Sequence, residues 1–192
     1  MEALSAWNRA QCALQVRVLL LLHNKYKELE MGFEIERKFL AMAFDPEKAD
    51  GIDNIVELLQ GYTAEGIRLT KRYNKKKKET DYKINYKSGR GLVRAEAQCA
   101  ITEDVFNALW PLTKNQRILK TRYIIPQKIG ELEIDVYHGC KMLPLQVAEI
   151  EFPTEGAAKV FDAKTLPEWV GKEVTGKAKY INKNLATKIT GL

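Results

Sequence analysis

The fold is constrained most by a two-residue alternation of charged and apolar side chains that recurs along the chain. In residues 33–40, Glu34, Glu36 and Lys38 fall on one face of an extended strand, and apolar side chains fall on the other. The same pattern predicts further strands over residues 66–73, 81–88, 92–100, 118–125, 130–137 and 146–152. A small domain seldom needs charges of both signs on so many strands, so we expect these faces to meet.

The charged faces restrict how the strands can be arranged. They collect Glu34, Glu36, Lys38, Arg68, Lys87, Arg94, Glu96, Lys120, Arg122, Glu133, Asp135, Glu149 and Glu151. Burying an unpaired ion costs on the order of several kcal/mol, so these side chains must be hydrated, paired or bound to a ligand. A closed antiparallel barrel with a polar interior, and helices on its apolar outside, satisfies every strand and predicts an α+β fold. The pattern leaves one alternative open, a sheet whose polar face is ordinary solvent-exposed surface.

Helices are expected around these strands. The apolar residues of segment 52–59 recur at helical spacing and predict a short outer helix. Thr102 precedes two acidic residues, as a helix N-cap does, and predicts a helix start. Further short helices are predicted near residues 154–163 and 167–170, and a final helical turn ends the tail 173–185.

Charge and cysteine content bear on partners and compartment. The 192 residues carry a net charge of +6, which favours an anionic partner such as nucleic acid, a membrane surface or a phosphorylated small molecule. Cys12, Cys99 and Cys140 are odd in number and lack CxxC spacing. This argues for a reducing compartment, the cytoplasm, and against a disulfide framework or a zinc site. A hard divalent cation held by carboxylates remains open.

Two segments bear on whether the anionic partner is a membrane or a nucleic acid. Residues 1–30 have apolar residues at helical spacing and predict a helical extension, followed by one domain over residues 31–192. The apolar run 18–22 is far shorter than the ~20 residues that span a bilayer, so no membrane partner is expected. The four lysines 75–78 are most simply a solvated hairpin tip, because the aromatic residues typical of nucleic-acid patches are not evident beside them. The oligomeric state is open, a homodimer included.

The ordered motifs resemble one known family. The pattern Glu34-x-Glu36-x-Lys38 is similar to the ExExK signature of the CYTH superfamily, the triphosphate tunnel metalloenzymes. Further matching segments follow in family order at residues 61–62, 67–69, 86–89, 94–96, 120–123, 133–136, 148–151 and 173–182. ExExK alone is a weak pattern, whereas ordered segments from residue 32 to the C-terminus are specific. The resemblance implies an eight-stranded antiparallel tunnel that binds a triphosphate.

The charged residues also suit a triphosphate on chemical grounds. Its negative charges call for lysines and arginines, and the predicted substrate-binding set is Lys38, Arg68, Lys87, Arg94, Lys120, Arg122 and Lys179. Carboxylates would repel this substrate unless a divalent cation lay between them. The predicted ligands of Mg²⁺ or Mn²⁺ are Glu34, Glu36, Glu149 and Glu151, of which the family uses the first two and the last. Lys120 and Arg122 are further expected to neutralise charge on the transferred phosphoryl group, and Glu133 or Asp135 to position the attacking water.

Two positions depart from the family pattern. Thr70 stands where similar proteins often have a second arginine, and Gln98 stands where an acid is common. We therefore expect the substrate to be bound more loosely or in a shifted position, with Lys179 as a candidate to compensate.

Three functions follow from the resemblance and the charges. The favoured one is metal-dependent hydrolysis of inorganic tripolyphosphate, as in the compact bacterial inorganic triphosphatases, with thiamine triphosphate as a related substrate. The second is a class IV adenylate cyclase that makes cyclic AMP and pyrophosphate from ATP, although no adenine pocket is evident. The third is a non-catalytic module that binds polyphosphate or RNA.

Overall fold

The computed structural model describes residues 29–89, 91–128, 130–139 and 145–186. The predicted extension over residues 1–30 therefore lies outside the described residues except for its last two. The strands are β1 Glu30–Ala41, β2 Asn54–Tyr62, β3 Arg68–Asn74, β4 Glu79–Ser88, β5 Val93–Ile101, β6 Arg117–Pro126, β7 Glu131–Tyr137, β8 Gln146–Glu151 and β9 Val170–Glu173. The helices are α2 Glu103–Leu109, α3 Glu155–Val160 and α4 Asn182–Ala186, with 3₁₀ turns η1 Trp110–Thr113, η2 Ala163–Thr165 and η3 Ala178–Tyr180.

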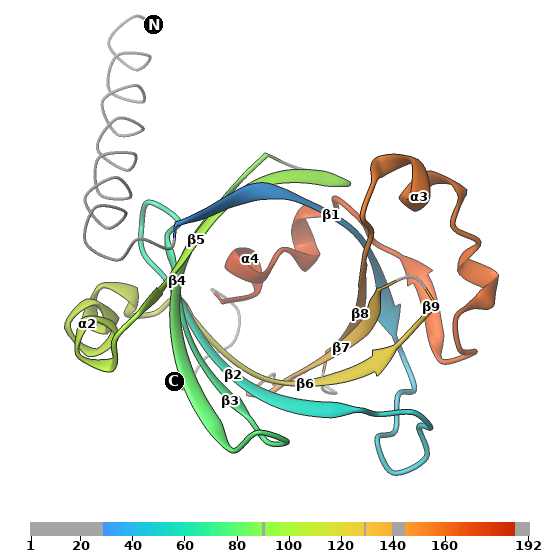
Figure 1. Ribbon diagram of the computed structural model, residues 1–192, viewed down its shortest axis with the longest axis horizontal. Coiled ribbons are helices and arrows are strands. Elements are labelled where there is room, and N and C mark those ends of the chain that lie inside the picture. The colour runs from blue at the N-terminus through green and yellow to red at the C-terminus, as the bar shows by residue number, and fades with distance from the viewer. Residues whose placement is uncertain (1–28, 90, 129, 140–144, 187–192) are drawn as a thin grey trace, which may run out of the picture.

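Eight antiparallel strands close into a ring, which confirms the predicted barrel (Figure 1). The order is β5-β4-β3-β2-β6-β7-β8-β1, and β1 returns to β5. Strand β1 makes this closure because residues 30–35 pair with β5 and residues 36–40 pair with β8. The short strand β9 pairs with β1 near Phe39 and Ala41, where β5 no longer accompanies it.

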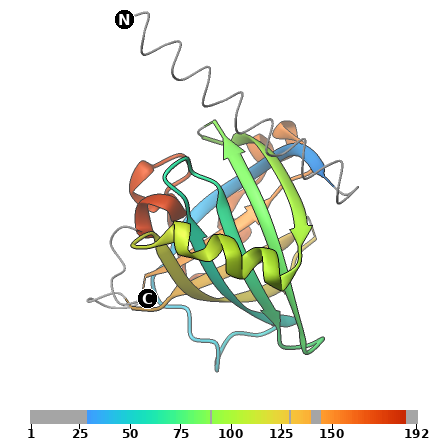
Figure 2. The same ribbon diagram turned by 90° about the vertical axis from the view of Figure 1, so that its left-hand side faces the viewer.

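Most of the apolar core lies outside the ring. Phe39, Ile134 and Ile150 are buried in one cluster on the outer face, beneath Ala158 of α3. A second outer cluster contains Leu69, Ile84 and Cys99 and is covered by Phe106 of α2. Figure 2 shows α2 lying across the outside of the strands. Most of the interior is thereby left to the charged faces, as the alternation predicts.

Helix α2 begins where the sequence predicts. The Thr102 hydroxyl accepts a hydrogen bond from the backbone N–H of Val105 at 3.4 Å, which is an N-cap interaction. Phe106 then stacks on Trp110 with ring centroids 4.9 Å apart. These two aromatic rings therefore pack outside the barrel.

Two predicted helices are wrong. The segment predicted as an outer helix over residues 52–59 forms most of β2, with Val56 and Leu58 buried and alternating in strand register. It was misread because apolar residues occupy both faces of this strand and hide the two-residue period. Residues 167–170 form a turn that leads into β9, where the edge of β1 provides backbone partners that an isolated helical turn lacks. The helix near residues 154–163 is present as α3.

Helix α4 closes one end of the barrel. Its residues Leu185 and Ala186 pack against Tyr62, Ile118 and Tyr137, which point inward at that end. The Tyr137 hydroxyl donates a 2.5 Å hydrogen bond to Oδ1 of Asn182. Figure 1 shows α4 across the ring, and Figure 2 places it at one end. No helix in the described part of the chain is long and apolar enough to cross a membrane.

Candidate active site

A polar cavity of about 450 Å³ fills the barrel. Because side chains alternate along each strand, every second residue of the ring points into it. The predicted site residues that line it are Glu34, Glu36, Lys38, Arg68, Lys87, Arg94, Lys120, Arg122, Glu133, Glu149 and Glu151. Asp135 and Lys179 do not line it.

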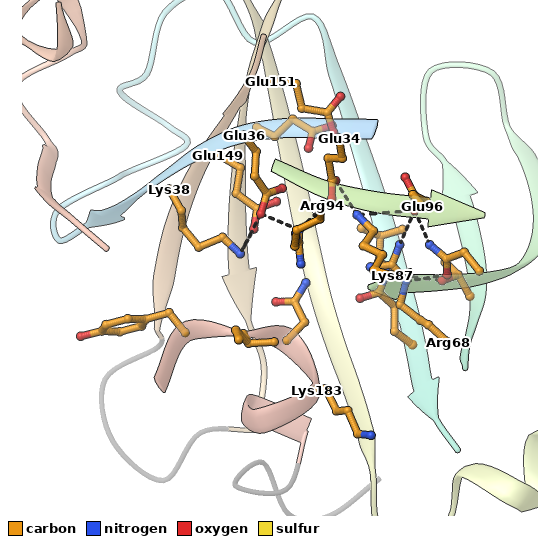
Figure 3. A pocket seen from close by; sticks show the side chains of 18 of the residues that line it. Glu34, Glu36, Lys38, Arg68, Lys87, Arg94, Glu96, Glu149, Glu151 and Lys183 are labelled. Atoms are coloured by element: carbon orange, nitrogen blue, oxygen red, sulfur yellow. Dashed lines mark hydrogen bonds and ion pairs between the residues drawn. The ribbon is translucent and has the colours of Figure 1, made fainter. Parts of the chain in front are cut away.

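Three carboxylates converge on one wall of the cavity. One oxygen each from Glu34, Glu36 and Glu151 lies within 4.8 Å of the others (Figure 3). The closure of β1 against β8 brings them together, because Glu36 and Glu151 are register partners. Arg94 bridges the group, with Nη2 at 2.8 Å from Glu34 and 2.6 Å from Glu36. We call Glu34, Glu36 and Glu151 the acidic cluster.

The acidic cluster holds more negative charge than its surroundings offset. Burial, followed by repulsion from Glu149, raises the pKa of Glu36 to about 7. Burial, followed by repulsion from Glu133, likewise raises the pKa of Glu151 to about 7. Burial acts in the same direction on Glu34, but the charges of Lys87 and Arg94 outweigh it and hold its pKa below the ordinary value. The cluster thus has the oxygen ligands and the charge that suit a hard divalent cation.

Glu149 lies beside the acidic cluster but is paired with cations. Its carboxylate lies 2.7 Å from Lys38 Nζ and 3.1 Å from Arg122 Nη2, and it does not join the acidic cluster. Burial acts to raise its pKa, but Lys38 and Arg122 outweigh burial and hold the pKa of Glu149 well below its ordinary value. The structure therefore pairs this carboxylate with cations, although the sequence grouped it with the metal ligands.

Asp135 shares the inward face of β7 with Glu133 but does not line the cavity. Its carboxylate is fully buried, accepts hydrogen bonds from Arg122 Nε at 2.7 Å and Nη2 at 2.8 Å, and also pairs with Lys120. Glu133, two residues earlier on β7, instead lines the cavity and pairs with Nη1 of Arg122. Burial raises the pKa of Glu133. Asp135 thus pairs with two cations, whereas Glu133 is the one of these two carboxylates that lines the cavity.

A second network holds Arg68 of β3 and Lys87 of β4 against Glu96 of β5. Arg68 Nε donates to Asn85 Oδ1 at 2.8 Å, and Asn85 Nδ2 donates to Glu96 Oε1 at 2.8 Å. Glu96 also lies 3.5 Å from Lys87 Nζ. Sequence reasoning gave Asn85 no role, although its place in the alternation of β4 puts it on the same face as Lys87.

The C-terminal segment supplies cations that sequence reasoning missed. Lys177 and Lys183 line the cavity, whereas the predicted Lys179 is exposed, with its Nζ 5.3 Å from the ring centroid of Tyr180. The backbone N–H of Lys38 donates to the Thr175 hydroxyl at 3.0 Å, which fixes this segment against β1. Turns have no simple side-chain period, so no sequence signal distinguishes Lys183 from Lys179.

Comparison with known proteins gives consistent relatives, although no family model matches the chain. An inorganic triphosphatase from Nitrosomonas europaea is 40% identical over 160 residues, covering 81% of this chain and 98% of that protein. An inorganic triphosphatase from Acetivibrio thermocellus is 32% identical over 160 residues, covering 81% of this chain and 94% of that protein.

Solved structures agree with these relatives. The crystal structure of an inorganic triphosphatase is 36% identical, with a TM-score of 0.56, and the match covers 82% of this chain and 97% of that one. A protein from Pyrococcus horikoshii, 18% identical with a TM-score of 0.51, shares the fold over 79% of this chain and 96% of that one. With this identity and coverage, and with the ExExK pattern placed inside a closed eight-stranded barrel, the chain belongs to the CYTH superfamily of triphosphate tunnel enzymes.

Proposed function

We propose that this protein is a metal-dependent triphosphatase that hydrolyses the terminal phosphoanhydride bond of inorganic tripolyphosphate. The observation that carries the proposal is the acidic cluster in the same cavity as a set of inward-facing cations. Phosphates and carboxylates are both negatively charged and repel one another. A site that presents carboxylates as well as cations therefore suits a phosphate chain with a divalent cation between the chain and the carboxylates. The relatives named as inorganic triphosphatases support this substrate class.

The acidic cluster fits Mg²⁺ or Mn²⁺. Glu34, Glu36 and Glu151 provide hard oxygen ligands within 4.8 Å of one another. Burial, and then repulsion between carboxylates, raises the pKa of Glu36 and Glu151 to about 7, and a bound cation would offset both effects. When bound there, the ion would supply charge neutralisation at the phosphoryl oxygens.

Carboxylates of the barrel wall hold several of the cations in position. Arg94 is held by Glu34 and Glu36, Arg122 by Asp135 and Glu149, and Lys38 also by Glu149. Guanidinium forks match pairs of phosphate oxygens, and lysines act as point charges. We assign substrate binding to Lys38, Arg68, Lys87, Arg94, Lys120 and Arg122. Lys120 and Arg122 are further assigned to the transferred phosphoryl group.

We assign Glu133 to orient the attacking water and accept its proton. Glu133 lines the cavity, and the raised pKa of its carboxyl makes it a better proton acceptor than an ordinary surface glutamate. Asp135 has both oxygens engaged by Arg122 and Lys120, so its assigned role is to hold these cations in place.

Other functions lack a supporting observation. Trp110 packs on Phe106 and Trp169 packs on Phe44, so neither offers a platform for a nucleobase or a thiazole. A non-catalytic polyphosphate or RNA module gives no reason for three converging carboxylates. The cytoplasmic location expected from the cysteines remains a prediction, as does any homodimer.

Product analysis tests the proposal. The protein is incubated with tripolyphosphate and, separately, with ATP, each with Mg²⁺, Mn²⁺ or a chelator. We expect orthophosphate and pyrophosphate from tripolyphosphate, and no product with chelator. Cyclic AMP with pyrophosphate from ATP would instead identify a cyclase. The absence of any product from either substrate would contradict an enzyme of this class.

A further inference from the structure

Lys83 of β4 differs from the other cations of the barrel wall. The six strand cations assigned above, Lys38, Arg68, Lys87, Arg94, Lys120 and Arg122, each lie within ion-pairing distance of a carboxylate. Arg72 pairs with Asp81 at 2.8 Å. Lys83 also lines the cavity, yet no hydrogen bond or ion pair joins its side chain to any residue that the structure describes. Its ammonium group is therefore available to an anion in the cavity.

The neighbours of Lys83 form a row of hydrogen-bonding groups across three strands. Thr70 of β3 pairs in register with Lys83 on one side and with Gln60 of β2 on the other. Gln60 Nε2 donates to the Thr70 hydroxyl at 3.4 Å, and Gln60 Oε1 is buried without a hydrogen-bond partner. The row offers an ammonium, a hydroxyl and an amide, and the ammonium of Lys83 is the only charged group of the three.

This row faces the acidic cluster across the barrel. Its middle strand, β3, is three strands from β1 along one arc of the ring and four from β8 along the other. In a barrel of eight strands, β3 therefore lies close to the wall opposite β1 and β8, as Figure 1 shows. A phosphate chain whose reacting end lies at the acidic cluster can therefore present its other end to Lys83.

We propose that Lys83, together with Thr70, binds the non-reacting end of the substrate and selects inorganic tripolyphosphate over nucleoside triphosphates. This inference rests on the proposed function. The far phosphate of tripolyphosphate is terminal and carries more negative charge than the corresponding phosphate of ATP, which is esterified to a nucleoside. An unpaired ammonium beside a hydroxyl favours the more highly charged group, and the row contains no aromatic ring to hold a base.

The test compares Lys83→Ala with Lys77→Ala. Lys77 is an exposed hairpin lysine outside the cavity, so its loss removes the same charge at a position with no role in binding. We expect Lys83→Ala to raise KM for tripolyphosphate about 10-fold with a smaller change in kcat, because a charge-assisted contact to the substrate is lost. The loss in kcat/KM for ATP should be clearly smaller. Lys77→Ala should match the wild type with both substrates.

A second variant and a second readout complete the test. Thr70→Arg introduced into Lys83→Ala restores a cation in the same row and should recover most of the affinity. Calorimetric titration of tripolyphosphate into chelator-treated protein should show Lys83→Ala binding about 10-fold more weakly than the wild type, a difference that does not require turnover. Equal behaviour of Lys83→Ala and Lys77→Ala in kinetics and titration would overturn the inference, as would equal losses for both substrates. A wild-type protein without turnover would overturn the proposed function, while the titration would still test Lys83.

Discussion

Two carboxylates of β7 show how a single residue's surroundings decide its role. Glu133 and Asp135 share one face of the strand, so sequence alone gives them equal claim to the attacking water. The structure separates them, because Glu133 lines the cavity and Asp135 is fully buried against Arg122 and Lys120. A strand's period tells which face a side chain takes, and not how deep along the barrel it lies.

Replacing each carboxylate by its amide should therefore affect a different property. Asp135→Asn removes the carboxylate that pairs with the buried Lys120 and with Arg122, so we expect the free energy of unfolding to fall by about 3 kcal/mol. Glu133→Gln leaves Arg122 paired with Asp135 and Glu149, so stability should change little. Its kcat should fall by about 10²-fold, because the proton acceptor is lost.

Denaturant unfolding and steady-state hydrolysis of tripolyphosphate, measured on both variants, check this pair. An unchanged kcat in Glu133→Gln would remove Glu133 from the proton transfer. An unchanged unfolding midpoint in Asp135→Asn would show that the buried carboxylate is not needed for stability.

The sequence predicts the inward-facing residues of the strands well, and those of the turns poorly. Glu34, Glu36 and Lys38 could be placed on one face because a strand repeats every two residues. For Lys179 no strand period applies, and Lys177 and Lys183 line the cavity in its place. Where the chain turns, side-chain direction depends on tertiary contacts that no short-range pattern records.

At the scale of elements, β2 marks the limit of periodicity. Strands with one polar and one apolar face were all located, within a few residues of their ends. In β2 the apolar residues fall on both faces, because Val56 and Leu58 point inward while the outer face packs against η1. Spacing alone then does not distinguish a strand from a buried helix. That β2 is a strand follows only from the need for an eighth strand to close the ring.

The packing of β2 on η1 predicts a large effect from a small substitution. A Cβ atom at Gly61 would lie 2.5 Å from Thr113 Oγ1 and 2.7 Å from Trp110 Cζ3, which is too close without movement of η1. Gly61→Ala should lower the free energy of unfolding by about 1–3 kcal/mol, since overpacking forces the surroundings to shift. The matched control is Gly32→Ala in β1, where nothing lies within 4 Å of the added atom. Comparable unfolding midpoints for the two variants, measured with urea, would argue against close contact between β2 and η1.

At the scale of the whole molecule, ring closure assembles the acidic cluster from distant parts of the chain. Glu36 and Glu151 become register partners only when β1 meets β8. Closing the barrel therefore buries these carboxyls and places them near other carboxylates, and together the two effects raise the pKa of both to about 7. A cation bound at this place would join the two strands and stabilise the closed ring.

The sign of the resulting pH dependence follows from proton binding. In the unfolded chain these carboxyls titrate near their ordinary pKa of 4.5, and in the folded protein near 7, so the folded state binds more protons between these values. The free energy of unfolding therefore falls as pH rises from 4.5 toward 7 on account of Glu36 and Glu151, and the loss is complete above about 7. Because a divalent cation binds the deprotonated carboxylates, it should restore stability most where they are ionised.

We therefore expect Mg²⁺ to stabilise the barrel more in alkaline than in acidic solution. One pH unit below the shared pKa, about one carboxyl in ten is ionised, and one unit above it about nine in ten are, so apparent metal affinity should differ about tenfold for each carboxylate. Calorimetric melting curves with Mg²⁺ and with chelator at both pH values provide the measurement, and Glu151→Gln, which removes one of the titrating ligands, should shrink the difference. An increase in Tm that is equal at the two pH values would contradict metal binding at the acidic cluster. An increase confined to the higher pH, and reduced in Glu151→Gln, would tie the stability of the closed ring to the carboxylates that its own closure brings together.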